Sequence, residues 1–368
     1  MSNDTRSFGR ANEAVTGNVA DDQRDASIDV ARGIAIIAIV LGHVLRGLDA
    51  AHLMDHVGWA PAADRILYLW HLSIFAFVGG VFVAKSVSKR PLRSYVGERT
   101  FKFLTVYLLW TVLQGAVLLG AARVVNNPRP LSSLLRVWAP SGQLWYLPFL
   151  AVLTLLVVPL KPWRRERAPW LLGLAAVLSV AMWGFDGGIV GTQGLGLVVF
   201  FVGGAIIGVD RLRPALRSIP TVVAAAGGIG LFALGMVAAI CADPTPPTTG
   251  WEGRTASSVA LGVALSILMS AAVLLVARAA RSWNFLAFCG RRSLDIYLAH
   301  IILASGSRIV LVKFGVHSLE LLIAVGLAAG VLGSLVVATA IRNTGLAWVF
   351  DGPAPPAWPS KRGARSRP

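Results

Sequence analysis

The chain has 368 residues, of which 55% are hydrophobic and 14% are charged, and its mean hydropathy is +0.67. A soluble domain carries about 25% charged residues, so this composition excludes a soluble globular protein and favours a polytopic membrane protein. The net charge of +16 is typical of Lys and Arg gathered in the cytoplasmic loops of a membrane protein, and we predict no nucleic-acid partner.

Ten apolar stretches follow a polar N-terminal segment, residues 1–27, which we predict to be disordered and cytoplasmic. A transmembrane helix needs about 20 mostly apolar residues, and the fourth and fifth stretches are short. The basic sequence KPWRRER, residues 161–167, separates these two and must lie outside the hydrocarbon. A basic, proline-rich tail, residues 342–368, is predicted to be cytoplasmic, and its last part, GPAPPAWPSKRGARSRP, residues 352–368, is predicted to be disordered. The predicted spans are about 28–48, 64–84, 100–120, 144–160, 168–184, 190–209, 220–241, 256–277, 292–312 and 319–341.

Basic loops alternate with loops that are poorer in Lys and Arg along this series of spans. The basic residues crowd the connections at 85–102, 161–167, 211–217 and 278–292, and they recur in the tail. Because cytoplasmic loops carry the excess of Lys and Arg, the alternation predicts that both termini lie in the cytoplasm. The predicted fold is an all-α integral membrane protein, a polytopic bundle of about ten transmembrane helices that forms one domain, residues 28–341.

The first predicted span carries two side chains that an apolar solvent penalises. Ten residues separate Arg32 from His43, and at about 100° per residue both fall on nearly one helix face, roughly 16 Å apart along the axis. Asp29 falls on the same side, one turn before Arg32. An ionisable side chain inside a span marks a functional site by default, and a histidine, with an unperturbed pKa of about 6.5, suits proton transfer. The alternative is a structural histidine that is hydrogen-bonded to a neighbouring helix.

The ninth predicted span begins with a second polar stripe. In RRSLDIYLAH, residues 291–300, the side chains of Ser293, Tyr297 and His300 are four and three residues apart and share a helix face, whereas Asp295 faces elsewhere. One polar stripe in an apolar span indicates a wet or protein-lined cavity. Hydrogen bonding between helices is the structural alternative.

Three further stretches place polar residues near the ends of predicted spans. GQLWYLPFL contains Trp145 and Tyr146, which line a site or, as is common for these residue types, lie at the membrane interface. His71 opens the second span in WHLSIFAFVGG, where the aromatic residues favour packing over binding. Arg99 and Lys102 lie three residues apart in GERTFKFL, where a basic loop re-enters the membrane, and the alternative to a binding role is an anchor to lipid head groups.

These five stretches together resemble the membrane acyltransferase-3 family, which includes O-antigen and exopolysaccharide O-acetylases and fucose 4-O-acetylase-like proteins. The family opens with an Asp-x-x-Arg-Gly stretch and a basic residue followed, after ten intervening residues, by a His, matched here by DVARG with Arg32 and His43. Its H-x-P-L-F-F-F-x-S-G element is similar to HLSIFAFVGG, where Ser73 replaces Pro and Gly79 replaces Ser. RTFK resembles the family's R-x-x-R pair with Lys102 in second place, LWYL is intact, and SLDIYLAH matches S-x-x-I-Y-L-x-H.

The resemblance, which covers about residues 24 to 340, implies a multi-pass enzyme of the bacterial inner (plasma) membrane. Such an O-acyltransferase moves a short acyl group, expected to be acetyl, from cytoplasmic acyl-CoA to a hydroxyl of a carbohydrate or glycoconjugate. The family's inferred chemistry makes His43 the catalytic residue, as a base or as an acyl acceptor. Arg32, Arg99 and Lys102 are the expected donor-binding residues, since Arg suits phosphate groups. The expected lining of the active site comprises Asp29, His71, Trp145, Tyr146, Ser293, Tyr297 and His300.

We expect no bound cofactor and no metal, with acyl-CoA as a co-substrate. The two cysteines, Cys241 and Cys289, show no metal-binding spacing and form no disulfide framework. An alternative of another class is a proton-coupled transporter or exporter of a small polar or glycosylated substrate, with His43 and His300 as a proton relay. A transporter favours inverted repeats and paired helix breaks, which we do not find in the sequence.

Overall fold

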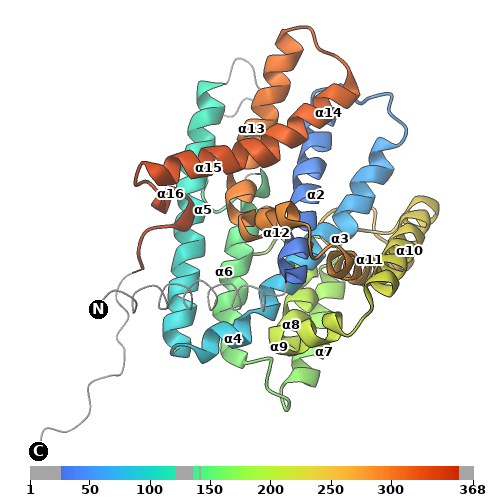
Figure 1. Ribbon diagram of the computed structural model, residues 1–368, viewed down its shortest axis with the longest axis vertical. Helices are drawn as coiled ribbons and strands as arrows, with labels where there is room; N and C mark the ends of the chain where they lie inside the picture. Colours follow the sequence, from blue (N-terminus) through green and yellow to red (C-terminus); the bar gives the residue numbers. More distant parts are fainter. Residues whose placement is uncertain (1–25, 122–135, 141, 356–368) are drawn as a thin grey trace, which may run out of the picture.

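The computed structural model describes residues 26–121, 136–140 and 142–355, and this part of the chain contains helices and no strand (Figure 1). The segments predicted to be disordered lie largely outside it, because residues 1–25 and 356–368 are not among the described residues. The described helices are α2 (Ser27–Asp49), α3 (Ala60–Val81), α4 (Val83–Ser88), α5 (Leu92–Gly120), α6 (Tyr146–Leu156), α7 (Ala168–Ala181), α8 (Val198–Ile207), α9 (Val209–Arg217), α10 (Thr221–Ala242), α11 (Ala256–Ala279), α12 (Asn284–Arg291), α13 (Ser293–Lys313), α14 (Leu319–Ala328), α15 (Ser334–Asn343) and α16 (Trp348–Asp351).

Short turns of other helix types adjoin four of these helices. A 3₁₀ turn, Gly142–Trp145, leads into α6, and a second one, Val158–Leu160, follows it. A third 3₁₀ turn, Leu195–Leu197, precedes α8. A π-helical turn, Ala329–Gly333, joins α14 to α15, so these three elements form one long segment.

Eight of the ten predicted spans are described helices that are long and apolar enough to cross a membrane. The fifth prediction, 168–184, yields only the 14-residue helix α7, whose length of about 21 Å is less than the roughly 30 Å of hydrocarbon. The sixth is bent, because α8 and α9 meet at an angle of 81° at Gly208, which has a φ of +67°. The protein is therefore an all-α, multi-pass membrane protein in which two predicted spans depart from straight, full-length helices.

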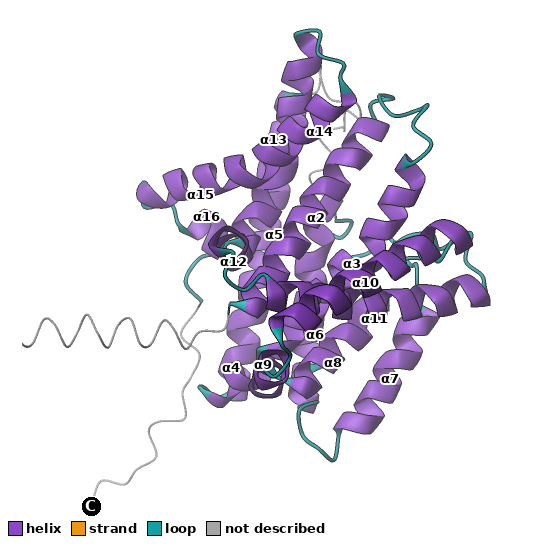
Figure 2. Cartoon of the chain, turned by 45° about the vertical axis from the view of Figure 1, so that its right-hand side comes forward, coloured by secondary structure: helices purple, strands orange, loops and turns teal. Residues whose placement is uncertain are grey.

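Helix α2 is the central element of the bundle. It contacts α3, α11, α12, α13 and α14, and most of its residues are buried (Figure 1). Helices α10 and α11 pack against each other and lie across the upright helices (Figure 2). The outer surface of α10 is apolar and open, with Val222 78% and Ile229 64% exposed, as expected for a face in contact with lipid tails.

Glycines allow α12 to approach the first turns of α2 at backbone distance. A Cβ atom added to Gly33 would collide with the backbone carbonyl of Leu286, and one added to Gly290 would collide with that of Asp29. Small residues serve this purpose at helix interfaces in membranes, where close van der Waals packing drives association. The contact fixes the start of α2, and with it the position of Arg32.

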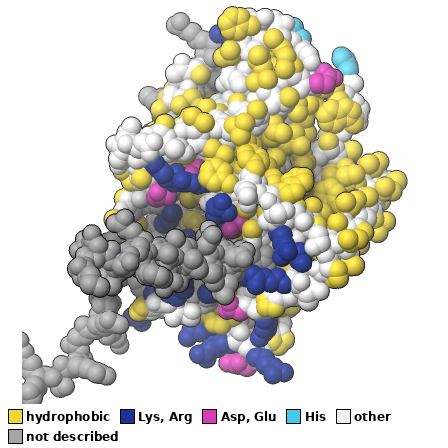
Figure 3. Space-filling model, viewed as in Figure 1, with side chains coloured by type: hydrophobic (Ala, Val, Ile, Leu, Met, Phe, Trp, Pro, Cys, Tyr) yellow, Lys and Arg dark blue, Asp and Glu magenta, His cyan; other side chains and the backbone are white. Residues whose placement is uncertain are grey.

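Lys and Arg side chains gather over the lower part of the molecule in the view of Figure 3. We call this the basic end, and it holds α4, α9, the start of α5 and the loop 161–167 (Figure 1). Helix α2 begins toward this end and runs away from it (Figure 1). Arg32 and His43 therefore lie at different depths in the bundle, with Arg32 nearer the basic end.

Candidate active site

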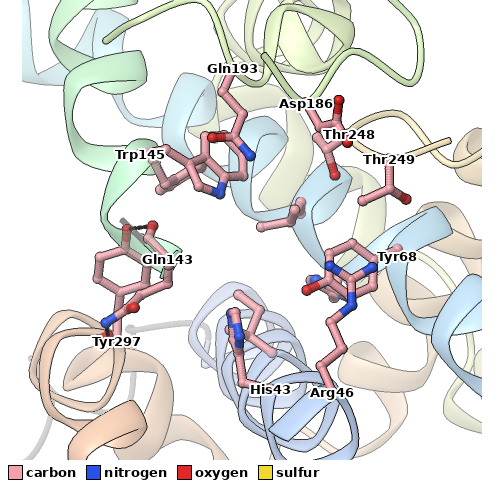
Figure 4. Close-up of a pocket in the computed structure, with 15 residues that line it drawn as sticks. His43, Arg46, Tyr68, Gln143, Trp145, Asp186, Gln193, Thr248, Thr249 and Tyr297 are labelled. Carbon is pink, nitrogen blue, oxygen red and sulfur yellow. Dashed lines mark hydrogen bonds between the residues drawn. The ribbon is translucent and has the colours of Figure 1, made fainter. Parts of the chain in front are cut away.

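A cavity of about 390 Å³ lies beside the second half of α2, and we call it the His43 cavity. Residues from α2, α3, the start of α6 with the 3₁₀ turn before it, and α13 form its walls. Two loops, between α7 and α8 and between α10 and α11, complete them. Its lining comprises Ile39, His43, Arg46, Tyr68, His71, Leu72, Gly142, Gln143, Trp145, Tyr146, Asp186, Gln193, Thr248, Thr249 and Tyr297 (Figure 4).

His43 reaches this cavity and is backed by a second histidine. The ring of His300 lies with its centroid 5.1 Å from that of His43 and is fully buried. Nδ1 of His300 donates to the backbone carbonyls of Ile296 and Tyr297, at 3.0 and 2.8 Å, so Nε2 carries the lone pair of a neutral ring. That Nε2 atom is buried and has no hydrogen-bond partner among the described residues.

The π-helical turn between α14 and α15 packs behind His300. Gly330 in this turn leaves room for the side chain of Val40 on α2, and a Cβ atom in its place would also contact His300 and Ala304 on α13. π-Turns inside α-helices are rare and occur frequently at functional sites. Here the turn holds α13 against α2 at the level of the two histidines.

Arg46, one turn after His43, carries a charge that is already matched. Its Nε and Nη2 atoms donate to the two carboxylate oxygens of Asp64, at 2.6 and 2.8 Å. The guanidinium also stacks over the ring of Tyr68, 3.6 Å from its centroid. The edge of Tyr68 meets the ring of His71, whose Nδ1 donates to the backbone carbonyl of Leu67. These contacts fix one wall of the cavity.

A second cavity, of about 220 Å³, lies nearer the basic end, and we call it the Arg32 cavity. Arg32, Arg99 and Lys102 supply three cations to its lining. Nη2 of Arg32 donates to Oγ of Ser293 at 2.7 Å, and Arg99 stacks over Phe103 at 4.9 Å from the ring centroid. In a partly buried site of this kind, cations with free donors suit phosphate groups.

Two tyrosines separate the cavities. Tyr146 and Tyr297 line both of them, and their ring centroids lie 6.2 Å apart. The hydroxyl of Tyr297 donates to the backbone carbonyl of Gln143, and Nε2 of Gln143 donates back to the Tyr297 carbonyl at 3.5 Å. The partition between the cationic cavity and the histidine cavity is thus two phenol rings, held by the turn before α6.

The structure distributes the predicted site residues over these two cavities. His71 and Trp145 line the His43 cavity only, Arg32, Arg99, Lys102 and Ser293 line the Arg32 cavity only, and Tyr146 and Tyr297 line both. Asp29 and His300 line neither cavity. Asp29 is buried at the start of α2 and is close enough to Arg32 to interact with it electrostatically.

Several lining residues were not among the sequence-based candidates. Arg46 lies on the same helix face as His43, three residues later, so helical spacing could have identified it. Asp186 and Thr248 come from loops far apart in the sequence and carried no comparable signal. Asp295 faces away from the cavities, as predicted, and pairs with Arg342 at 2.7 Å. Within the described residues, no three His, Cys, Asp or Glu side chains are placed to hold a metal ion.

The bundle of apolar helices defines a multi-pass membrane protein, and two neighbouring cavities, which share Tyr146 and Tyr297 as lining residues, lie within it. A family model described as an acyltransferase domain, Acyl_transf_3, matches residues 25–342. The chain therefore belongs to the acyltransferase-3 family and is an acyltransferase.

Two curated relatives carry the name Nodulation protein NolL. The one from Mesorhizobium japonicum is 28% identical over 97 residues, which cover 25% of this chain and 24% of the relative. The one from Sinorhizobium fredii is 28% identical over 92 residues, or 25% of each chain. The matched part thus spans about a quarter of the length of these relatives. No solved structure matches the chain.

Proposed function

We propose that this enzyme transfers a short acyl group, with acetyl as the first choice, from acyl-CoA to a hydroxyl of a carbohydrate or glycoconjugate. The observation that carries the proposal is the pair of cavities that share Tyr146 and Tyr297 as a wall, with three cations on one side and His43 on the other. A thioester donor with an anionic head would need the cationic environment, and an acceptor with a neutral hydroxyl would need the histidine. The two environments must lie next to each other for the acyl group to pass between them.

The donor would bind with its phosphates on the cationic side. Arg99 and Lys102 on α5 and Arg32 on α2 supply charge-assisted hydrogen bonds to phosphate oxygens. The pantetheine arm would then extend past the two tyrosines toward His43. Because the cations lie toward the basic end, this arrangement favours entry of the donor from the cytoplasm, with the basic end and both termini on that side.

His43 would supply the proton transfer that the reaction needs. The hydroxyl of the acceptor is a weak nucleophile at neutral pH, so an imidazole that removes its proton accelerates attack on the thioester carbonyl. In this route the acceptor oxygen forms the ester bond, the carbon–sulfur bond breaks, and the proton leaves with the CoA thiolate. In the second route, His43 first receives the acyl group and then passes it to the hydroxyl.

Membrane vesicles that contain the protein, supplied with radiolabelled acetyl-CoA, would test the proposal. We expect label to enter a saccharide-containing fraction with wild-type protein, and His43→Ala to abolish most of this transfer. His52→Ala is the matched control, because His52 is exposed in the loop between α2 and α3 and lines neither cavity. Equal labelling with and without the protein would contradict the proposal. Placement in a bacterial inner membrane would be tested by fractionation of the cells that produce it.

A further inference from the structure

The wall of the His43 cavity that lies opposite His43 is formed by two loops. Figure 4 shows Gln193, Asp186 and Thr248 across the cavity from His43, with Thr249 beside them. Gln193 and Asp186 belong to the loop between α7 and α8, and the two threonines belong to the loop between α10 and α11. This wall faces the base, so the molecule that presents a hydroxyl to His43 must contact it.

Hydrogen bonds join the two loops to each other, so this wall has a defined conformation. Nε1 of Trp183 donates to the carbonyl of Thr245 at 2.7 Å, and the backbone N–H of Gly184 donates to the carbonyl of Pro247 at 3.1 Å. Gly184 has a φ of +83°, a conformation that favours glycine. Nη1 of Arg254 donates to the carbonyl of Trp183 at 2.9 Å. These hydrogen bonds hold the loop that carries Asp186 against the loop that carries Thr248.

The charges of this cavity do not suit an anionic acceptor. The guanidinium of Arg46 is engaged by both oxygens of Asp64, and Tyr68 covers one of its faces. Asp186 adds a carboxylate that makes no ion pair within the described part of the chain, although Arg46 is close enough to interact with it electrostatically. A carboxylate, phosphate or sulfate on the acceptor would therefore meet an unpaired negative charge and no free cation.

Two residues of the lining each carry a buried polar atom that makes no hydrogen bond within the described residues. Oε1 of Gln143 and Oγ1 of Thr248 make no hydrogen bond within the described residues, although these side chains are only 2% and 1% exposed. Buried polar atoms are nearly always hydrogen-bonded, and each unmet one costs about 1–3 kcal/mol. Both atoms are covered by protein, so a ligand with several hydroxyls would satisfy them once these side chains turn toward the cavity on binding.

From these observations we propose that the acceptor is an uncharged sugar unit and that Asp186 determines this specificity by accepting hydrogen bonds from its hydroxyls. The inference rests on the proposed acyl transfer and adds the charge class of the acceptor. An ionised carboxylate can accept from two neighbouring hydroxyls, and such charge-assisted bonds are about twice as strong as neutral ones. The cavity of about 390 Å³ is near the lower end of the range for ligand sites, which suits the end of a glycan.

The acceptor's charge class can be read from the product. Glycans and glycosylated metabolites from cells with and without the full-length protein would be compared by tandem mass spectrometry, which assigns the ester to one sugar unit. An ester on a neutral hexose, deoxyhexose or N-acylated amino sugar is expected. An ester on a uronic acid, a sialic acid, a phosphorylated sugar or a free amino sugar would overturn the inference. Absence of any protein-dependent ester would overturn the proposed function, and the inference with it.

A substitution then tests the role of Asp186. Asp186→Asn keeps the shape of the side chain and removes its charge, so we expect the apparent KM for the identified acceptor to rise by about ten- to a hundredfold. The KM for acetyl-CoA and kcat should stay near the wild-type values, because Asp186 is not among the residues that line the Arg32 cavity. Asp55→Asn, in the exposed loop after α2, is the matched control. An unchanged acceptor KM in properly inserted Asp186→Asn protein would overturn the assignment.

Discussion

The His43–His300 pair allows a double-mutant cycle that separates a catalytic base from a structural histidine. His43 is partly exposed to its cavity and makes no side-chain hydrogen bond among the described residues, so His43→Ala enlarges a cavity that already exists. His300 is fully buried, and its removal would leave a void. We therefore choose His300→Phe, which keeps a ring of similar volume and removes both nitrogens.

The expected magnitudes follow from the roles that we propose for the two rings. Loss of a general base lowers the rate by about 10²–10⁴-fold, or roughly 2.7–5.5 kcal/mol of barrier. His300 does not line the His43 cavity, so we expect it to act by orienting His43 through the ring contact of 5.1 Å. Misplacement of a reacting group by about 1 Å costs up to about 10²-fold, so His300→Phe should be the milder change. In the His43→Ala background, His300→Phe should have no further effect.

The assay is acyl transfer from labelled acetyl-CoA in membrane vesicles, normalised to the amount of inserted protein. Single and double variants would be compared for kcat and for the KM of each substrate. If the double variant loses no more kcat than His43→Ala alone, the two histidines act as one unit. Turnover near the wild-type value in His43→Ala would refute the catalytic assignment and favour a structural role for this histidine. Fully additive losses would show that His300 acts independently of His43.

Three further predictions test other parts of the structure. Arg99→Ala should raise the KM for acyl-CoA about ten- to a hundredfold, through loss of a charge-assisted bond to a phosphate, and an unchanged donor KM would assign this residue to lipid anchoring. In protein that lacks the exposed Cys241, Gly58→Cys should react with an impermeant thiol reagent added outside sealed cells, whereas Ser88→Cys should not. Equal labelling of the two variants would refute the predicted sidedness. Gly290→Ala should lower the thermal unfolding midpoint of the detergent-purified protein by forcing α12 away from α2, at a cost of about 1–3 kcal/mol. Gly230→Ala, at an exposed position within α10, should not lower it, because Ala favours a helix more than Gly does.

Hydropathy predicted the fold class and most of the spans because both depend on local composition. Eight apolar stretches of sufficient length became candidate spanning helices. The two departures have local causes that a count of apolar residues does not register. Gly208 adopts a positive φ and turns the chain by 81° between α8 and α9. α7 ends at Ala181, and the chain then turns at Gly184, also at positive φ, into the loop that closes the His43 cavity.

Helical spacing predicted those parts of the site that lie on single helices. It placed Arg32 and His43 on one face of α2, and each lines one of two neighbouring cavities. It could not predict Asp186 or Thr248, since loops approach each other only through the packing of the helices that carry them. Nor could it predict the π-turn behind His300, because AGVLG is as compatible with an α-helix as the residues around it.

In the reaction that we propose, helix α2 would set the distance between the charged head of the donor and the reacting group. The eleven-residue step from Arg32 to His43 corresponds to about 16 Å of rise along α2, and every backbone hydrogen bond within that step resists a change in length. α12 fixes the first turns of α2 through Gly33 and Gly290, while α13 and the π-turn fix it at the level of His43. A displacement of either contact would move one substrate's site relative to the other's. Substitutions that loosen α2, far from any reacting atom, should therefore lower kcat for a fully bound donor, because they change the approach of the thioester to the base.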